Sequence, residues 1–210
     1  VKIDGADPVL STEADVEAHL SCLRLAAFTV DSVKRGVRRR RPSPPFTTST
    51  LQQEASRKLG FTAKKTMAVA QQLYEGVDIP GEGSIGLITY MRTDSTNIST
   101  EAQREARTLI ESRFGSAYLP AKSPEYKTRS QRAQEAHEAI RPTSCLRHPD
   151  ALKESLQRDQ HRLYQLVWQR FVSSQMEDAV YDTVTVDVLG KGETRAYLFR
   201  SSGSRLKFQG

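Results

Sequence analysis

A tyrosine and an arginine two residues apart are the side chains of this sequence best suited to covalent chemistry. They are Tyr90 and Arg92, in the segment LITYMRTDSTN of residues 87–97. Side chains two apart lie on one face of an extended strand, so the phenol and the guanidinium would point the same way if a strand continues through them. A neighbouring cation favours the ionised, nucleophilic form of a phenol and also binds a phosphate oxygen. The spacing makes Tyr90 a candidate nucleophile and Arg92 a candidate charge stabiliser.

The residues that follow fit the same interpretation. Asp94 accepts hydrogen bonds and would hold Arg92 in place, while Ser95 and Thr96 suit either a turn or contacts with phosphate. The simpler alternative is that Tyr90 packs at a sheet edge with its hydroxyl satisfied. For an isolated Tyr-x-Arg sequence, that alternative is the better one.

A second group of functional side chains lies in AHEAIRPT, residues 136–143. We expect a short helix over residues 134–140, ended by Pro142. His137 and Arg141 are four residues apart and would share one face of that helix. An imidazole beside a guanidinium makes an anion site, although Glu138 is a candidate ion-pair partner with a purely structural role.

Six cations between residues 34 and 41 form a basic run: Lys34, Arg35, Arg38, Arg39, Arg40 and Arg41. Each could neutralise a phosphate and add to a salt-dependent affinity for nucleic acid. Alternatively, the run is a solvated edge strand that its charges protect from association. The run alone favours neither interpretation. The formal net charge of +6 and the pI near 9.4 favour polyanions as partners.

The composition describes a soluble globular chain of 210 residues, with 37% hydrophobic and 27% charged residues. No apolar run approaches the roughly 20 residues of a membrane span, and the N-terminus lacks the apolar core of a secretory signal. Two cysteines, Cys22 and Cys145, match neither a disulfide framework nor a metal knuckle, which indicates a reducing compartment.

The pattern of apolar, capping and breaker residues predicts a helical body between segments of β character. Capping-box spacing at Thr50 and Gln53 and at Thr100 and Gln103 marks two helix starts, and Gly60, Gly76 and Gly115 mark helix ends. The expected helices are 11–23, 50–59, 62–75, 100–114 and one or two within 150–176; the expected strands are 24–36, 85–90, 179–190, 195–201 and 205–210.

The segment GEGSIG, residues 81–86, begins within the loop 76–84 and has the spelling of a dinucleotide-binding loop. A true loop of that kind follows a strand and opens a helix, whereas this one precedes β-type sequence, so we expect only a flexible connector. Two prolines, Pro44 and Pro45, mark a boundary. We predict an α+β chain: a discontinuous antiparallel β domain, residues 1–45 and 168–210, into which a mainly helical domain, residues 46–167, is inserted.

Three segments together resemble the type IA DNA topoisomerases, in particular bacterial topoisomerase I. They are LITYMRTDSTNIS, QEAHEAIRPT and PPFTTSTLQQEASRKLGF with the following KKTMAVAQQLYE. In that family the matching tyrosine attacks a phosphodiester of single-stranded DNA, becomes joined to the 5′ phosphate and releases a 3′ hydroxyl. The resemblance implies that Tyr90 is the nucleophile, that Arg92 stabilises charge at the scissile phosphate and that His137 contacts a DNA phosphate. We extend phosphate binding to Arg141 by geometry and to Asp94 and Ser95 by their place in the motif.

The resemblance also implies the domain roles. The helical domain would be the mobile, winged-helix-like tyrosine domain, and the β segments would be the arch and hinge. The family's Toprim domain with its Mg²⁺ ligands, and most of the base that grips DNA, should precede residue 1. We therefore expect no cofactor within this chain, Mg²⁺ in the parent enzyme, and no relaxation of supercoiled DNA by this chain alone.

The remaining expectations concern partners and location. The resemblance implies single-stranded DNA and the Toprim and base domains of the same chain as partners, no membrane, a monomer, and a cytoplasmic, nucleoid-associated enzyme that works without ATP. The competing hypothesis is a non-catalytic winged-helix module that binds single-stranded nucleic acid, in which Tyr90 only stacks or packs.

Overall fold

The computed structural model describes residues 1–126 and 137–210 and divides the chain into two compact units. The sheet unit comprises Val1–Arg40 and Ala179–Gln209, and the helical unit comprises Arg41–Asp178 with the terminal Gly210. The helical unit thus begins at 41 rather than 46 and ends at 178 rather than 167. The second difference arises because the last helix continues past 167 and carries Trp168 and Phe171 into the helical core.

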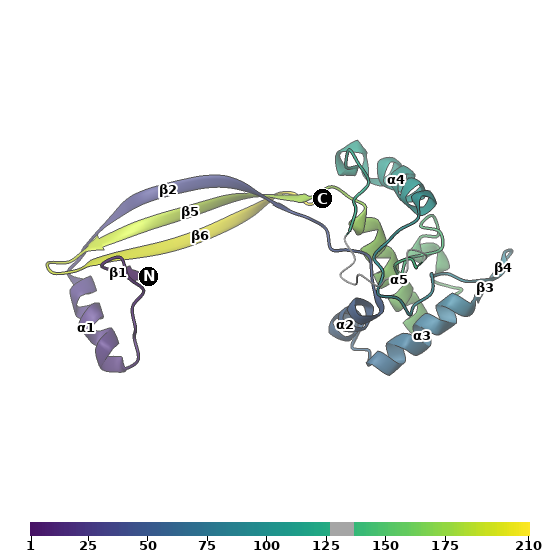
Figure 1. Ribbon diagram of the computed structural model, residues 1–210, viewed down its shortest axis with the longest axis horizontal. Helices are drawn as coiled ribbons and strands as arrows, with labels where there is room; N and C mark the ends of the chain where they lie inside the picture. Colours follow the sequence, from purple (N-terminus) through teal and green to yellow (C-terminus); the bar gives the residue numbers. More distant parts are fainter. Residues whose placement is uncertain (127–136) are drawn as a thin grey trace. The chain divides into compact units, whose positions relative to one another are not determined.

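The sheet unit is built on three long antiparallel strands, β2 (Ala27–Arg40), β5 (Ala179–Lys191) and β6 (Ala196–Phe208), which run side by side in Figure 1. The short β1 (Lys2–Ile3) pairs with β6, so the strand order is β1-β6-β5-β2. The basic run falls mainly on β2, which forms one edge of the sheet, as the edge-strand interpretation expected.

The C-terminal segment contradicts one prediction. Instead of two strands at 195–201 and 205–210 joined by a turn, β6 is continuous. Ser201, Ser202 and Gly203 each have a partner on β5, in register with Val186, Thr185 and Val184. The Ser-Ser-Gly composition suggested a turn, but pairing along the whole of β5 holds these residues extended.

Helix α1 (Glu13–Arg24) confirms the helix expected at 11–23. Thr12 caps it, and Asp15 completes a capping box by accepting from the Thr12 backbone amide at 2.9 Å. The helix lies against β6 through His19, whose Nδ1 is 3.2 Å from the hydroxyl of the buried Tyr197.

The helical unit contains α2 (Thr48–Leu59), α3 (Ala63–Glu75), α4 (Thr100–Phe114) and α5 (Arg158–Ser174), with short 3₁₀ turns at Ser116–Tyr118 and Pro149–Leu152. Gly60 ends α2 in the left-handed conformation, with φ 70°, and Thr62 caps α3, both as expected. Two N-caps differ from the prediction: Thr47 caps α2 through a box with Thr50, and Ser99 caps α4.

Buried apolar side chains from all four helices and the intervening loops form one core in the helical unit. Helix α5 is its most deeply buried element, because Leu163, Tyr164 and Val167 are fully enclosed. Leu51 and Ala55 of α2 and Ala70 and Leu73 of α3 pack into the same core. No helix in the described residues is long and apolar enough to cross a membrane.

A hairpin follows α3 where a loop was expected. Its strands are β3 (Val77–Ile79) and β4 (Gly83–Ile85), paired antiparallel. GEGSIG is therefore part of a hairpin and not a flexible connector. The expected strand 85–90 is also wrong beyond Ile85, since only Ile88 makes an isolated bridge there. Helices α2 and α3 are thus followed directly by the β3–β4 hairpin. The assignment of this domain as winged-helix-like remains a prediction.

A helix was expected at residues 134–140. Residues 134–136 lie outside the described residues, and residues 137–140, which the structure describes, are not helical. The backbone amide of Ala139 donates to the Asn97 carbonyl at 2.8 Å, and that of Ile140 donates to the Phe46 carbonyl at 2.8 Å. These distant partners replace the carbonyls that a helix would have used.

Gly86 has a steric role that gives a testable prediction. A Cβ atom at Gly86 would lie 2.7 Å from the Tyr74 carbonyl oxygen, so Gly86→Ala must displace backbone. We expect a loss of about 1–3 kcal/mol in the free energy of unfolding. Urea titration followed by the fluorescence of Trp168, the single tryptophan and a core residue of this unit, measures it. Lys64→Ala, at an exposed position on α3 of the same unit, is the control; equal stability of the two variants would contradict the steric role.

Candidate active site

Tyr90 lies directly after a short paired segment and is 48% exposed. Around it, exposed and buried side chains alternate: Tyr90, Arg92 and Asp94 are exposed, and Met91, Thr93 and Ser95 are buried. The alternation expected of a strand is therefore present although residues 91 and 92 form a bend. The phenol and the Arg92 guanidinium are both accessible to solvent.

A cavity of about 340 Å³ opens at Tyr90. It brings together three separate stretches of sequence, and its lining residues are Tyr74, Thr89, Tyr90, Thr93, His137 and Glu138. The structure thus places His137 beside the same cavity as Tyr90. Arg92, Asp94, Ser95 and Arg141 do not line it.

Backbone pairing explains how Tyr90 and His137 come to share a cavity. The Thr89 amide donates to the Arg141 carbonyl at 2.9 Å, and the Thr143 amide donates to the Leu87 carbonyl at 3.0 Å. The Thr89 hydroxyl donates to the Ala139 carbonyl at 2.7 Å and accepts from the Arg141 amide at 3.0 Å. These bonds fix the residue before Tyr90 against the segment that carries His137.

Thr48 holds the other side of the tyrosine segment. Its hydroxyl donates to the Met91 carbonyl at 2.7 Å and accepts from the Thr93 amide at 2.9 Å, and its own amide donates to the Thr93 carbonyl at 2.9 Å. The first residue of α2 thereby fixes the bend that contains Arg92. The sequence carries no signal for this role, because Thr48 is one of several hydroxyl residues around the helix start.

Ser95 is not accessible for the phosphate contact that was predicted for it. It is fully buried, its hydroxyl accepts from the Asn97 amide at 3.1 Å, and its amide donates to the Thr93 hydroxyl at 3.1 Å. Ser95 therefore stabilises a turn, which was the alternative considered for it. Asp94 is exposed, and no ion pair joins it to Arg92 among the described contacts, so the expected Asp94–Arg92 clamp is absent.

Arg141 also differs from its predicted role. Its Nη2 is 2.6 Å from Glu138 Oε2, its Nη1 donates to the Pro142 carbonyl at 2.9 Å, and its side chain is 11% exposed. It lines a different cavity, together with Ser99 and Glu105. The anion site of His137 and Arg141 is not formed, because these residues are not on a helix and Arg141 is already paired with Glu138.

Glu138 is the anchor of this segment. Its Oε1 accepts from the Ser99 amide at 2.7 Å, so one carboxylate joins the N-terminus of α4 to Arg141. Burial opposes its ionisation, but the Arg141 charge and the hydrogen bonds of Ser99 and Arg141 outweigh burial and hold the pKa of Glu138 below its ordinary value. Glu138 is therefore ionised and structural at neutral pH.

Tyr74, on the last turn of α3, is a site residue that the sequence analysis missed. Its ring lies edge-to-face against the Tyr90 ring, with centroids 5.4 Å apart and an interplanar angle of 64°. It lines the same cavity and is 40% exposed. An exposed aromatic residue at the end of a helix whose other apolar positions face the core was the available signal.

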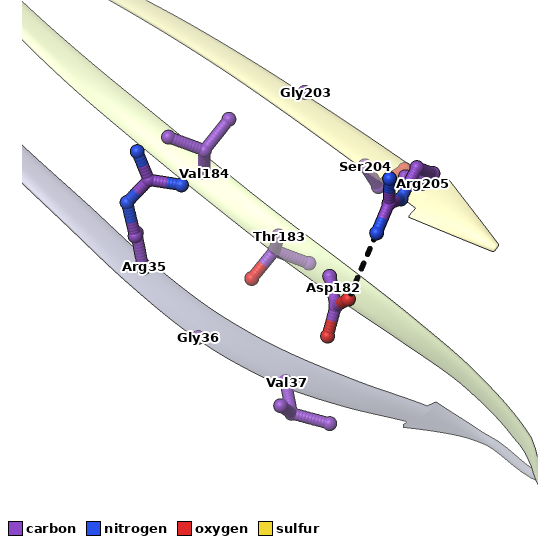
Figure 2. A pocket seen from close by; sticks show the side chains of 9 residues that line it. All are labelled: Arg35, Gly36, Val37, Asp182, Thr183, Val184, Gly203, Ser204 and Arg205. Carbon is purple, nitrogen blue, oxygen red and sulfur yellow. Dashed lines mark ion pairs between the residues drawn. The ribbon is translucent and has the colours of Figure 1, made fainter. Parts of the chain in front are cut away.

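A larger cavity, of about 700 Å³, lies in the sheet unit and is not near Tyr90 in sequence. Figure 2 shows Arg35, Val37, Asp182 and Arg205 around it, with an Arg205–Asp182 ion pair at 3.8 Å. Gly36 and Gly203 leave the sheet surface open there. This hollow spans β2, β5 and β6 and brings together a cation of the basic run, Arg35, and one of β6, Arg205. Its lining residues include no tyrosine, cysteine or histidine.

The described residues contain no group of three or more His, Cys, Asp or Glu side chains that could hold a metal ion. The chemistry available at Tyr90 from these residues is therefore a phenol nucleophile, an imidazole and a nearby guanidinium. That set suits transfer of a phosphoryl group to the phenol oxygen.

Comparison with known proteins identifies relatives of the whole chain. Residues 6–210 match the DNA topoisomerase family. The structure resembles that of full-length topoisomerase I from Thermotoga maritima, with a TM-score of 0.77 and 38% sequence identity. The match covers 98% of this chain and 32% of the Thermotoga protein, so the chain spans about a third of the length of that relative.

The Glu138 carboxylate predicts how stability depends on pH. Because its pKa is lowered in the folded state, its contribution is complete above the ordinary glutamate value of 4.5 and is lost as the pH falls through the lower, folded-state value. Glu138→Gln should therefore lower the free energy of unfolding at pH 7, and the difference from the native chain should shrink below pH 4.5. Urea titrations followed by Trp168 fluorescence at several pH values measure this difference.

The control for this prediction is Glu154→Gln, which removes an exposed carboxylate to which the described residues offer no ion pair. It should change stability at pH 7 less than Glu138→Gln does. If the Glu138→Gln difference stayed constant from pH 7 to pH 3, the carboxylate would not be the anchor of this segment.

Proposed function

The chain belongs to the DNA topoisomerase family, and we propose that it supplies the tyrosine with which a type IA enzyme cuts and rejoins one strand of DNA. The observation that carries the proposal is the exposed Tyr90 phenol, which shares a cavity with His137. Both residues lie in the segments on which the resemblance to that family rests. The non-catalytic alternative, a winged-helix module for single-stranded nucleic acid, is not favoured by a family match that covers nearly the whole chain.

In the proposed reaction the Tyr90 hydroxyl oxygen attacks the phosphorus of a phosphodiester in single-stranded DNA. A bond forms between the phenolic oxygen and phosphorus while the bond from phosphorus to the 3′ oxygen breaks. The phenol loses its proton, and the departing 3′ oxygen gains one. Because one phosphodiester replaces another, the 3′ hydroxyl can reverse the step without ATP, and torsional strain in the DNA gives relaxation of negative supercoils its direction.

Arg92 and His137 have complementary roles in this proposal. Arg92 is exposed, and no carboxylate of the described residues pairs with it, which leaves its guanidinium available for the charge that develops on the phosphate. His137 lines the cavity at Tyr90 and would donate a hydrogen bond to a neighbouring phosphate. Arg141 and Ser95 have no part in the reaction in this proposal, because their polar groups already pair with other residues of the fold.

The remainder of the activity would come from parts of the enzyme outside this chain. We infer that a Toprim domain supplies the Mg²⁺ ligands and that a base domain binds most of the single strand. The sheet unit would act as the arch and hinge. We expect the complete enzyme to be a cytoplasmic, nucleoid-associated monomer and the isolated chain to be inactive in relaxation.

Tyr90→Phe tests the nucleophile, because it removes the hydroxyl and leaves the ring. In the complete enzyme we expect no covalent adduct with a single-stranded oligonucleotide, while the affinity for that oligonucleotide is retained. Denaturing gels with a labelled oligonucleotide, and peptide mass mapping of the native adduct to Tyr90, measure both. Tyr74→Phe, which removes a hydroxyl at the same cavity, is the control and should form the adduct. Adduct formation by Tyr90→Phe would refute the proposal.

Arg92→Ala tests charge stabilisation at the phosphate. We expect the single-turnover cleavage rate in the complete enzyme to fall by about 10²-fold or more. Arg92→Lys should recover only part of the rate, because lysine keeps the charge but not the paired donors. Arg104→Ala removes an exposed arginine from α4 and should cleave at the native rate. A native rate for Arg92→Ala would assign the charge stabilisation to another residue.

A further inference from the structure

The Tyr90 ring makes a single aromatic contact within the described residues, and that contact is with Tyr74. The two rings meet edge-to-face at 5.4 Å, an arrangement in which the positive edge of one ring meets the negative face of the other. No hydrogen bond within the described part of the chain holds the Tyr90 hydroxyl. The orientation of the Tyr90 side chain therefore depends on the neighbouring ring.

The backbone at Tyr74 is held by tertiary contacts. Tyr74 lies on the last turn of α3, beside the fully buried Leu73, whose carbonyl accepts from the Leu87 amide at 2.7 Å. The Tyr74 carbonyl lies so close to Gly86 that a Cβ atom there would come within 2.7 Å of it. The end of α3 and the start of the tyrosine segment are thus in backbone contact. The backbone that carries the Tyr74 ring is thus held beside the partly exposed Tyr90 phenol, to which the described residues make no hydrogen bond.

We propose that Tyr74 is a positioning residue, whose ring restricts the rotation of the Tyr90 side chain and keeps the phenol oriented for attack. The inference rests on the proposed function, since it assigns to Tyr90 the nucleophilic oxygen. The Tyr74 hydroxyl has no hydrogen bond among the described contacts, so the effect belongs to the ring and not to the hydroxyl. Restricting a nucleophile before the reaction lowers the entropy that the transition state must lose.

A direct contact with DNA is the competing role for Tyr74. Its exposed ring also lines the cavity and offers a face on which a nucleobase could stack. The two roles predict different kinetics. A stacking residue contributes to the affinity for DNA, whereas a positioning residue contributes to the rate of cleavage after DNA has bound.

The test uses the complete enzyme with a labelled single-stranded oligonucleotide and the variants Tyr74→Leu, Tyr74→Ala and Tyr74→Phe. For Leu and Ala we expect the single-turnover cleavage rate to fall about three- to tenfold, the effect of one aromatic pair, with the Kd for the oligonucleotide unchanged. Tyr74→Phe keeps the ring and should restore the native rate. Recovery by phenylalanine but not by leucine separates the ring contact from mere apolar bulk.

A second measurement distinguishes positioning from a general structural role. In the covalent adduct the bond to phosphorus already fixes the phenolic oxygen, so a positioning residue has no more to contribute. The isolated adducts of Tyr74→Leu and Tyr74→Ala should therefore rejoin the strand at the native rate, although they form more slowly. General damage to the site would slow both steps.

Phe114→Ala is the matched control. Phe114 is 38% exposed, its ring lies 6.1 Å from that of Tyr118, and it lies on α4 rather than at the cavity. It should leave cleavage, rejoining and Kd unchanged. Trp168 fluorescence establishes that each variant is folded, and Tyr74→Leu, which retains apolar bulk, carries the test if Tyr74→Ala does not fold.

The same measurements can overturn the positioning role of Tyr74 and, separately, the proposed function. Native cleavage by folded Tyr74→Leu, a raised Kd with an unchanged cleavage rate, or equal slowing of cleavage and rejoining would each overturn the positioning role. Failure of the proposed function is distinguishable, because the native enzyme would then form no adduct, or Tyr90→Phe would still form one. The Tyr74 inference fails alone when Tyr90 forms the adduct and the Tyr74 ring has no effect on it.

Discussion

The candidate site depends on the pairing of two short segments that are far apart in the sequence, residues 87–89 and 139–143. Backbone amides and carbonyls of Leu87, Thr89, Arg141 and Thr143 bond across the pair, and the Thr89 hydroxyl adds two further bonds. The pairing is too irregular to form a sheet, but it satisfies buried backbone groups that would otherwise be costly. Tyr90 follows one segment and His137 precedes the other, so the same bonds that complete the fold bring them to one cavity.

Local signals predicted the parts of the fold in which local bonds prevail. Gly60, Thr62, Gly76 and Gly115 end or begin helices as expected, because a cap is formed by residues within one turn of it. The errors occur where distant backbone partners prevail. Residues 137–140 have the composition of a helix, yet Asn97 and Phe46 accept from their amides, and the Ser-Ser-Gly stretch is held extended by β5. No local pattern contains those partners.

The same distinction applies to the site. The spacing around Tyr90 predicted that Tyr90 and Arg92 share a face, which agrees with the alternation of exposed and buried residues there. The segment AHEAIRPT, in contrast, contains two kinds of residue. His137 lines the cavity, while Glu138 and Arg141 join each other and the start of α4. Arginine within a recognisable motif is easily interpreted as an anion ligand, whereas its burial and pairing are tertiary properties. Thr48 and Tyr74 were missed for the same reason, since their contacts with the tyrosine segment cross between elements.

The register of the long sheet has a consequence for how the two units are joined. Arg40 and Ala179, the last residue of β2 and the first of β5, are direct partners in the ladder. Paired Cα atoms of antiparallel strands are about 5 Å apart, so the helical unit leaves the sheet and returns to it at almost the same point. In topological terms the whole helical unit occupies the place of a hairpin turn. A change in the length of such an excursion would leave the register of the two strands unaltered, because their pairing beyond Arg40 and Ala179 does not depend on it.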